Sequence, residues 1–361
     1  MKESRFSRRK LLQLGGSLLA TAPFVSMVKP VFAGQPDPVI VSTRRPFGRA
    51  IQQGIAVREQ PSTDANLVRR LKWNEVIAIK GQTTSEKSPS DYNQIWYQTD
   101  DGFVYSAFIQ PAENTLNKQL DDVGSDGFWG EITVPVTAAR GGPGSTFYQG
   151  YYYYYGCIFK VIASKLDKDG HHWYQIGDEY SGSGLHVLAE HMRRVPEDEF
   201  TPLSPDVPAE NKHIDVDVTK QLVTAYEGDQ PVFTARVATG ATFRLSNGTM
   251  QYFRTIPGDH RIYSKTPTQH MVGGTAGDTD YYDLPGIGWC SYFTSSGIAF
   301  HGTYWHNDYG KPRSHGCVNM LPEDAKWIFR WTLPTVSLVP DPVDWNDWRS
   351  GSTHVTVVET L

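Results

Sequence analysis

Cysteine is scarce in this chain, with only Cys157, Cys290 and Cys317 among its 361 residues. An odd number leaves at least one thiol free or paired between chains. A Cys290–Cys317 disulfide is compatible with the sequence and would remove Cys317 as a reactive thiol. The residues around Cys317, described below, instead favour a free thiol.

The chain also lacks an excess of positive charge. Charged residues make up 20% and hydrophobic residues 39%, which excludes a membrane-embedded or disordered chain. The net charge is -5, and removal of residues 1–33, with six basic residues and one acidic residue, would leave -10. Nucleic-acid binding needs a basic patch, so no nucleic acid is expected as a partner. Purely electrostatic attraction to an anionic wall polymer is disfavoured for the same reason.

The N-terminus has no uninterrupted apolar run. Residues 7–12 (Ser-Arg-Arg-Lys-Leu-Leu) precede a diluted apolar stretch that ends near Val28, and residues 31–33 (Val-Phe-Ala) follow. A charged start, an apolar middle and small residues at the exit are typical of a signal peptide, and the paired arginines resemble a twin-arginine signal. We therefore expect residues 1–33 to be a cleaved signal and the protein to be exported to the periplasm or cell wall. The alternative is an uncleaved membrane anchor, which would be the protein's only contact with the membrane.

Alternating helix and strand patterns are missing as well, which argues against a doubly wound sheet. Tyr, Trp, Gly and Pro are plentiful and favour strands joined by turns, so a mainly β fold is predicted. Residues 44–112 and 126–197 are weak copies of each other: Arg58 and Arg140 are 82 positions apart, and the Trp-Tyr-Gln triplets at Trp96 and Trp173 are 77 apart.

The two copies resemble bacterial Src-homology-3-like domains, which are small β-barrels, and the second is degenerate. Polar residues 113–125 and the proline-rich residues 201–208 are predicted linkers. We expect Trp96 and Trp173 to lie in the cores of the barrels. The second copy carries five consecutive tyrosines, Tyr151 to Tyr155, which either bind peptide or glycan or belong to a core or spacer; the sequence does not decide between these.

A third domain is predicted over residues 209–361. Residues 214–218 alternate apolar and acidic side chains, as in a strand with one wet face. Residues 297–300 are predicted to form a buried strand that leads into His301, and residues 353–359 a closing strand. Residues 322–330 begin with proline, carry acids in the first turn and end with arginine, which predicts a helix.

The strongest chemical motif lies near the C-terminal end, where residues 314–319 read Ser-His-Gly-Cys-Val-Asn and His301 stands upstream. Acyl transfer needs a thiolate nucleophile, a base and donors for the oxyanion. Cys317 is the expected nucleophile, and a neighbouring imidazolium would lower its pKa. Gly316 allows a carbonyl to approach the backbone closely, and backbone N–H groups near Gly316 and Cys317 are the expected oxyanion donors. Spacing alone does not say whether His301 or His315 is the base.

This motif resembles the signature of L,D-transpeptidases, and the resemblance covers about the last two-fifths of the chain. Residues 255–258 (Thr-Ile-Pro-Gly) match a turn common in that family, with one residue inserted. The resemblance implies a β-sandwich fold with one or two short helices and His301 as the base and acid. It implies cleavage of a peptidoglycan tetrapeptide stem, loss of D-alanine and cross-linking to a second stem through a Cys317 thioester. No metal and no cofactor are expected.

Further residues near the motif are candidates for substrate binding: Ser314, Arg313, Asn319, Met271, Tyr292 and Trp305. Arg313 would suit an acidic stem, because a guanidinium meets a carboxylate in two-point fashion. His315 would hold the thiolate or order the substrate, whereas His306 has no assigned role and is expected at the surface.

Four alternatives remain. Water in place of the acceptor amine would make the protein an L,D-carboxypeptidase. A papain-like endopeptidase is disfavoured because the cysteine precedes the histidine in that family. Zinc binding by His301, His306, His315 and Cys317 fits no standard spacing. The chain could also be a non-catalytic wall-binding protein, although the intact signature argues against this.

Overall fold

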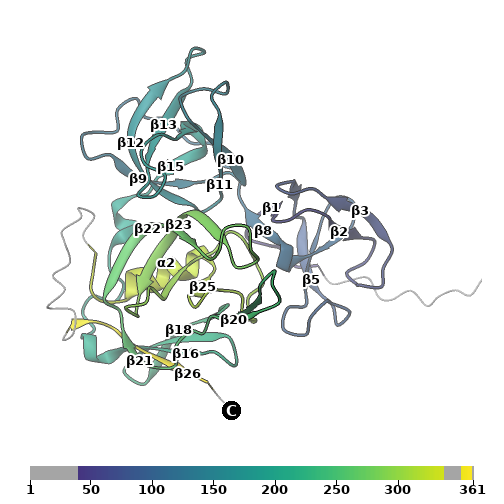
Figure 1. The fold of residues 1–361 in the computed structure, drawn as a ribbon, viewed down its shortest axis with the longest axis vertical. Coiled ribbons are helices and arrows are strands. Elements are labelled where there is room, and N and C mark those ends of the chain that lie inside the picture. The colour runs from purple at the N-terminus through teal and green to yellow at the C-terminus, as the bar shows by residue number, and fades with distance from the viewer. Residues whose placement is uncertain (1–39, 337–350, 360–361) are drawn as a thin grey trace, which may run out of the picture. The chain divides into compact units, whose positions relative to one another are not determined.

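Strands dominate the fold, as the composition predicts. The computed structural model describes residues 40–336 and 351–359 (Figure 1), so the predicted signal peptide lies outside the described residues. Within them, no helix is both long and apolar enough to span a membrane.

Residues 44–112 form two sheets whose apolar faces share a small core. In the first sheet the order is β4 (Val76–Ala78), β1 (Phe47–Ala50) and β8 (Ile109–Ala112). In the second the order is β3 (Leu67–Leu71), β2 (Ile55–Arg58), β7 (Phe103–Tyr105), β6 (Ile95–Gln98) and β5 (Gly81–Thr84). Trp96 is 2% exposed, which confirms its predicted place in a core.

Residues 126–197 form one sheet of seven strands. Its order is β11 (Gln149–Tyr154), β10 (Val136–Arg140), β14 (His186–Leu188), β13 (His172–Gly177), β12 (Ile158–Leu166), β9 (Phe128–Ile132) and β15 (Met192–Arg194). Trp173 is buried, as predicted. In both segments the strand pairing leaves sheets with two ends, so the expected closed barrels are open sheets within the described residues. The Src-homology-3-like assignment and the domain boundaries remain predictions.

The C-terminal part contains three sheets. The five-stranded sheet has the order β18 (Gln230–Arg236), β17 (Leu222–Glu227), β16 (Lys212–Asp217), β26 (His354–Val358) and β21 (Gly258–Arg261). The four-stranded sheet has the order β22 (Ser264–Gly273), β23 (Tyr282–Tyr292), β24 (Ala299–Gly302) and β25 (Val318–Met320). A hairpin joins β19 (Thr242–Arg244) to β20 (Met250–Tyr252). Short 3₁₀ turns occupy Ser106–Phe108, Ala189–His191, Glu197–Phe200 and Ala209–Asn211.

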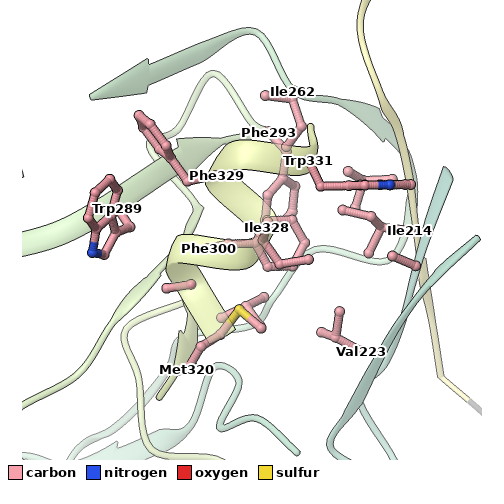
Figure 2. Packing of buried hydrophobic residues seen from close by; sticks show 14 of the residues in the cluster. Ile214, Val223, Ile262, Trp289, Phe293, Phe300, Met320, Ile328, Phe329 and Trp331 are labelled. Carbon is pink, nitrogen blue, oxygen red and sulfur yellow. The ribbon is translucent and has the colours of Figure 1, made fainter. Parts of the chain in front are cut away.

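The helix α2 (Pro322–Trp331) confirms the helix predicted over residues 322–330. Proline stands at its start, Glu323 and Asp324 lie in its first turn, and Arg330 lies in its last turn, which suits the helix dipole. Its apolar side chains join residues of the five-stranded and four-stranded sheets in one core. Figure 2 shows Ile328, Phe329 and Trp331 of α2 among the apolar side chains of this core. This packing fixes β24 and β25, which carry the residues of the predicted site.

Candidate active site

Two parallel strands bring the separated halves of the motif together. β24 pairs with β25 so that His301 lies opposite Asn319 and Phe300 lies opposite Val318. Phe300 and Val318 are fully buried in the core, and that packing anchors both strands. Because side chains alternate along a strand, Cys317, two positions before Asn319, lies on the same face of the sheet as His301. The predicted strand before His301 is confirmed as β24.

A cavity of about 830 Å³ lies on this face of the sheet. Nine of the ten predicted site residues line it: His301, Trp305, Arg313, Ser314, His315, Cys317, Asn319, Met271 and Tyr292. Gly316, the tenth, lies between two of them in the chain. The structure therefore places the predicted site residues at one cavity, although their roles remain predictions.

The imidazole of His301 is buried and held on both sides. Its Nδ1 lies 3.0 Å from the Gly302 carbonyl oxygen, and its Nε2 lies 3.2 Å from the amide nitrogen of Asn319. A carbonyl can only accept, so Nδ1 carries the proton and Nε2 offers a lone pair. Burial lowers the pKa of His301 to about 4. The ring is thus a neutral base at physiological pH.

His306 completes a chain of contacts behind His301. The carbonyl oxygen of Asn319 lies 3.0 Å from Nε2 of His306, whose Nδ1 accepts the backbone N–H of Asp308 at 3.3 Å. His306 is 8% exposed, so the expectation of a surface residue was wrong. Burial lowers the pKa of His306 to about 4. A neutral His306 with its proton on Nε2 fixes which end of the Asn319 amide faces His301.

Arg313 is already paired within the protein. Its Nε lies 2.9 Å from an oxygen of the buried Asp308, and its Nη2 contacts the same oxygen. Its backbone N–H donates to the Thr239 carbonyl at 2.8 Å. The ion pair with Asp308 therefore stabilises the segment between His306 and Ser314, and Arg313 also lines the cavity.

The turn that carries Cys317 is held by two hydroxyl groups. The Ser314 hydroxyl accepts the N–H of Gly316 at 3.1 Å and donates to the carbonyl of Cys317. The Thr255 hydroxyl donates to the Gly316 carbonyl at 2.7 Å. Gly316 has φ +115°, which side chains rarely adopt. The Gly316 N–H, one of the expected oxyanion donors, is thus already occupied by Ser314.

The electrostatics of Cys317 differ from the sequence-based expectation. Burial raises the pKa of its thiol to about 11, and Sγ lies 3.7 Å from the Gly297 carbonyl oxygen. The expected thiolate–imidazolium pair is therefore not the resting state, because the neighbouring imidazole is neutral too. The cause is desolvation, which disfavours charge on both groups.

His315 stacks on aromatic rings. Its ring centroid lies 4.3 Å from that of Phe243, 4.4 Å from that of Phe253 and 4.7 Å from that of Tyr282. Its Nε2 is buried with no hydrogen-bond partner, and burial lowers its pKa. This packing holds the turn before Cys317 in place.

Sequence reasoning missed several contributors to the site. The hydroxyl of Thr255 was within reach of prediction, because residues 255–258 matched a family turn. Phe243 and Phe253 gave no signal. Neither did a buried cluster in which His270 contacts Asp178 through Nδ1 at 2.9 Å and Asp283 through Nε2 at 2.6 Å.

All three cysteines lie in the described part of the chain, and each is free. The Cys290–Cys317 disulfide is therefore not formed. Over residues 40–336 and 351–359, no group of three or more His, Cys, Asp or Glu side chains could hold a metal ion.

Residues 211–344 match the family model of the L,D-transpeptidase catalytic domain. No curated protein matches the chain. Among solved structures, an L,D-transpeptidase from Mycobacterium smegmatis is 19% identical, with a TM-score of 0.31, over 41% of this chain and 58% of that one. The catalytic domain of the Enterococcus faecium enzyme is 20% identical, with a TM-score of 0.29, over 41% of this chain and 98% of that one. An L,D-transpeptidase in complex with imipenem is 18% identical, with a TM-score of 0.31, over 52% of this chain and 77% of that one.

Proposed function

We propose that this chain, whose residues 211–344 are an L,D-transpeptidase catalytic domain, cross-links peptidoglycan stems through a thioester on Cys317. One observation carries the proposal: within the matched segment, His301 on β24 and Cys317, immediately before the adjacent parallel strand β25, line one cavity. As implied by the family, the donor is a tetrapeptide stem. Export to the periplasm or cell wall, where such stems occur, is part of the proposal.

The neutral resting pair defines the first chemical step. As Sγ of Cys317 attacks the carbonyl carbon of the third stem residue, its proton passes to Nε2 of His301. For this to occur, Nε2 exchanges its contact with the Asn319 amide for one with the thiol. Charge then develops only while substrate fills the cavity, where the attacked oxygen needs hydrogen-bond donors.

The second step returns the proton. The tetrahedral intermediate collapses, the bond to the terminal D-alanine breaks, and the proton on His301 passes to the departing amine. A thioester between Cys317 and the third residue remains. The amine of a neighbouring stem attacks that thioester, His301 accepts the amine proton, and the same proton returns to the sulfur as the new amide forms.

The remaining cavity residues have supporting roles in this proposal. Ser314 and Gly316 shape the turn under the scissile bond. Met271, Tyr292 and Trp305 give an apolar wall for the stem, and Arg313 presents a partly neutralised cation. His315 keeps the turn packed. The mechanism uses no metal and no cofactor.

The proposal is tested by incubating the protein with a purified tetrapeptide stem and separating the products. We expect released D-alanine and a cross-linked dimer from the parent protein and neither from Cys317→Ala. D-alanine without dimer would assign the chain as an L,D-carboxypeptidase. Products from Cys317→Ala, or none from a folded parent, would contradict the proposal; in the second case the chain would be a non-catalytic wall-binding protein.

A further inference from the structure

The run of five tyrosines is only partly a core element. Tyr151 to Tyr154 lie on β11, the edge strand of the seven-stranded sheet. Tyr153 is fully buried, whereas Tyr151, Tyr152 and Tyr154 face a separate groove of about 440 Å³. The exposed Trp73 lies on the same groove, with its ring 5.5 Å from that of Tyr152 and nearly perpendicular to it. The two rings therefore meet edge to face at a place that solvent can reach.

The aromatic groove, as we call it, shares a wall with the active-site cavity. Asp283, Leu284 and Trp305 line both. The ring of Trp305 lies 5.8 Å from that of His301 on the cavity side and 5.1 Å from that of Tyr304 on the groove side. The groove therefore lies directly beside the cavity.

The charged residues of the groove are already paired within the protein. Arg49 is 2% exposed, and its guanidinium donates to Gln110, to Asn74 and to the Tyr304 carbonyl. One oxygen of Asp283 contacts His270, and the other accepts the hydroxyl of Tyr151 at 3.1 Å. Among the residues that the structure describes, these two are the only Arg, Lys, Asp or Glu side chains in the lining, and both are paired within the protein.

We propose that the aromatic groove binds the neutral glycan strand that carries the stem peptide. A pyranose ring presents a face of C–H groups to the electron-rich face of Trp or Tyr, and its hydroxyl groups remain free for water and nearby amides. Gln149, an exposed residue of the groove lining, supplies such an amide. Binding through uncharged groups also suits an acidic protein, because its net negative charge does not attract an anionic polymer. This inference rests on the proposed function for the identity of the stem.

The test separates sugar binding from catalysis. The ligand is a neutral oligosaccharide of N-acetylglucosamine, which has pyranose rings but no stem peptide and no carboxylate. The protein is Cys317→Ala, so that no thioester is needed for the signal. We expect the double variant Trp73→Ala/Tyr152→Ala to lose affinity by about tenfold or more, because two stacking faces are removed. Phe147→Ala is the matched control: it removes an exposed aromatic ring of the same segment that lies outside the groove, and binding should be unchanged.

A second measurement uses the active protein. With a free tetrapeptide, the double variant should be acylated as fast as the parent, whereas with glycan-linked stems its KM should rise. Unchanged glycan binding in the double variant would overturn the inference, as would equal losses with free and glycan-linked stems, which would mean that the rings only support the cavity. If no thioester forms but glycan binding still depends on Trp73 and Tyr152, the proposed function fails and the sugar site stands.

Discussion

The amide nitrogen of Asn319 lies 3.2 Å from Nε2 of His301, the atom that takes the proton of Cys317 in the proposed mechanism. This contact holds the imidazole in one tautomer and one orientation before substrate arrives. The carbonyl oxygen of the same Asn319 amide contacts His306. Three buried side chains, His301, Asn319 and His306, therefore form one chain of hydrogen bonds.

Asn319→Ala is expected to slow acylation by about 10-fold to 100-fold, because without the Asn319 amide the imidazole is free to adopt other tautomers and rotamers. The measurement is the rate of thioester formation with a carbapenem such as imipenem. His306→Gln is the companion variant, since its amide can still donate to Asn319, and it should lose much less. Equal rates in Asn319→Ala and the parent would remove Asn319 from the mechanism.

The pH dependence of acylation follows from the two shifted groups. The pKa of His301 is lowered to about 4, so the base is already unprotonated above about pH 5. The pKa of the Cys317 thiol is raised to about 11, so thiolate contributes only at high pH. The acylation rate should therefore be nearly flat from about pH 5 to about pH 9. An acid limb centred near pH 6 to 7 would instead show that the base keeps an ordinary imidazole pKa.

Thr255 should matter through its hydroxyl rather than its methyl group. Thr255→Val leaves the buried Gly316 carbonyl and the Gly240 N–H without their partner and should lower the free energy of unfolding by about 1–3 kcal/mol. It should also slow acylation, since the turn before Cys317 loosens. Thr255→Ser retains the hydroxyl and should behave like the parent in urea unfolding and in acylation. A stable, fully active Thr255→Val protein would refute this role.

The buried His270 predicts a dependence of stability on pH. Burial disfavours charge on this ring, but the hydrogen bonds and charges of Asp178 and Asp283 outweigh it and raise the pKa above its usual value. A raised folded-state pKa stabilises the fold fully below the unfolded value of about 6.5, and the effect is lost as pH rises through the folded value. Urea unfolding should therefore show stability falling above neutral pH.

The matched variant for this prediction is His270→Gln, which cannot take a charge. It should be destabilised by about 3 kcal/mol near pH 6, because the buried carboxylate of Asp178 and the partly buried carboxylate of Asp283 lose their cation. The difference from the parent should shrink as pH rises. A difference that stays constant across pH would show that His270 contributes by packing alone.

The parts of the fold that depend on local pattern were predictable. The ten residues of α2 themselves indicate the helix: proline at its start, acids in its first turn, arginine in its last turn and apolar residues on one face. The strand before His301 was equally predictable, since it depends on neighbouring residues. The family motif then named Cys317 and His301 without any structure.

What escaped prediction depends on tertiary contacts. His270 and Asp178 are 92 positions apart, and no spacing rule links them. His306 was expected at the surface because nothing in the sequence shows that it is buried and bonded to Asn319. The pKa of Cys317 was expected to fall because the sequence shows a histidine nearby. Only the fold reveals the burial that raises this pKa instead. The expected barrels depended on strand closure, which the repeat pattern does not encode.

The central claim is that Cys317 becomes acylated by the tripeptide part of a stem. Intact-protein mass spectrometry after brief mixing with a purified tetrapeptide tests it most directly. The account predicts a mass gain equal to the tripeptide acyl group, with D-alanine lost, in the parent and none in Cys317→Ala. A folded parent that gains no mass, or an adduct that persists in Cys317→Ala, would contradict it.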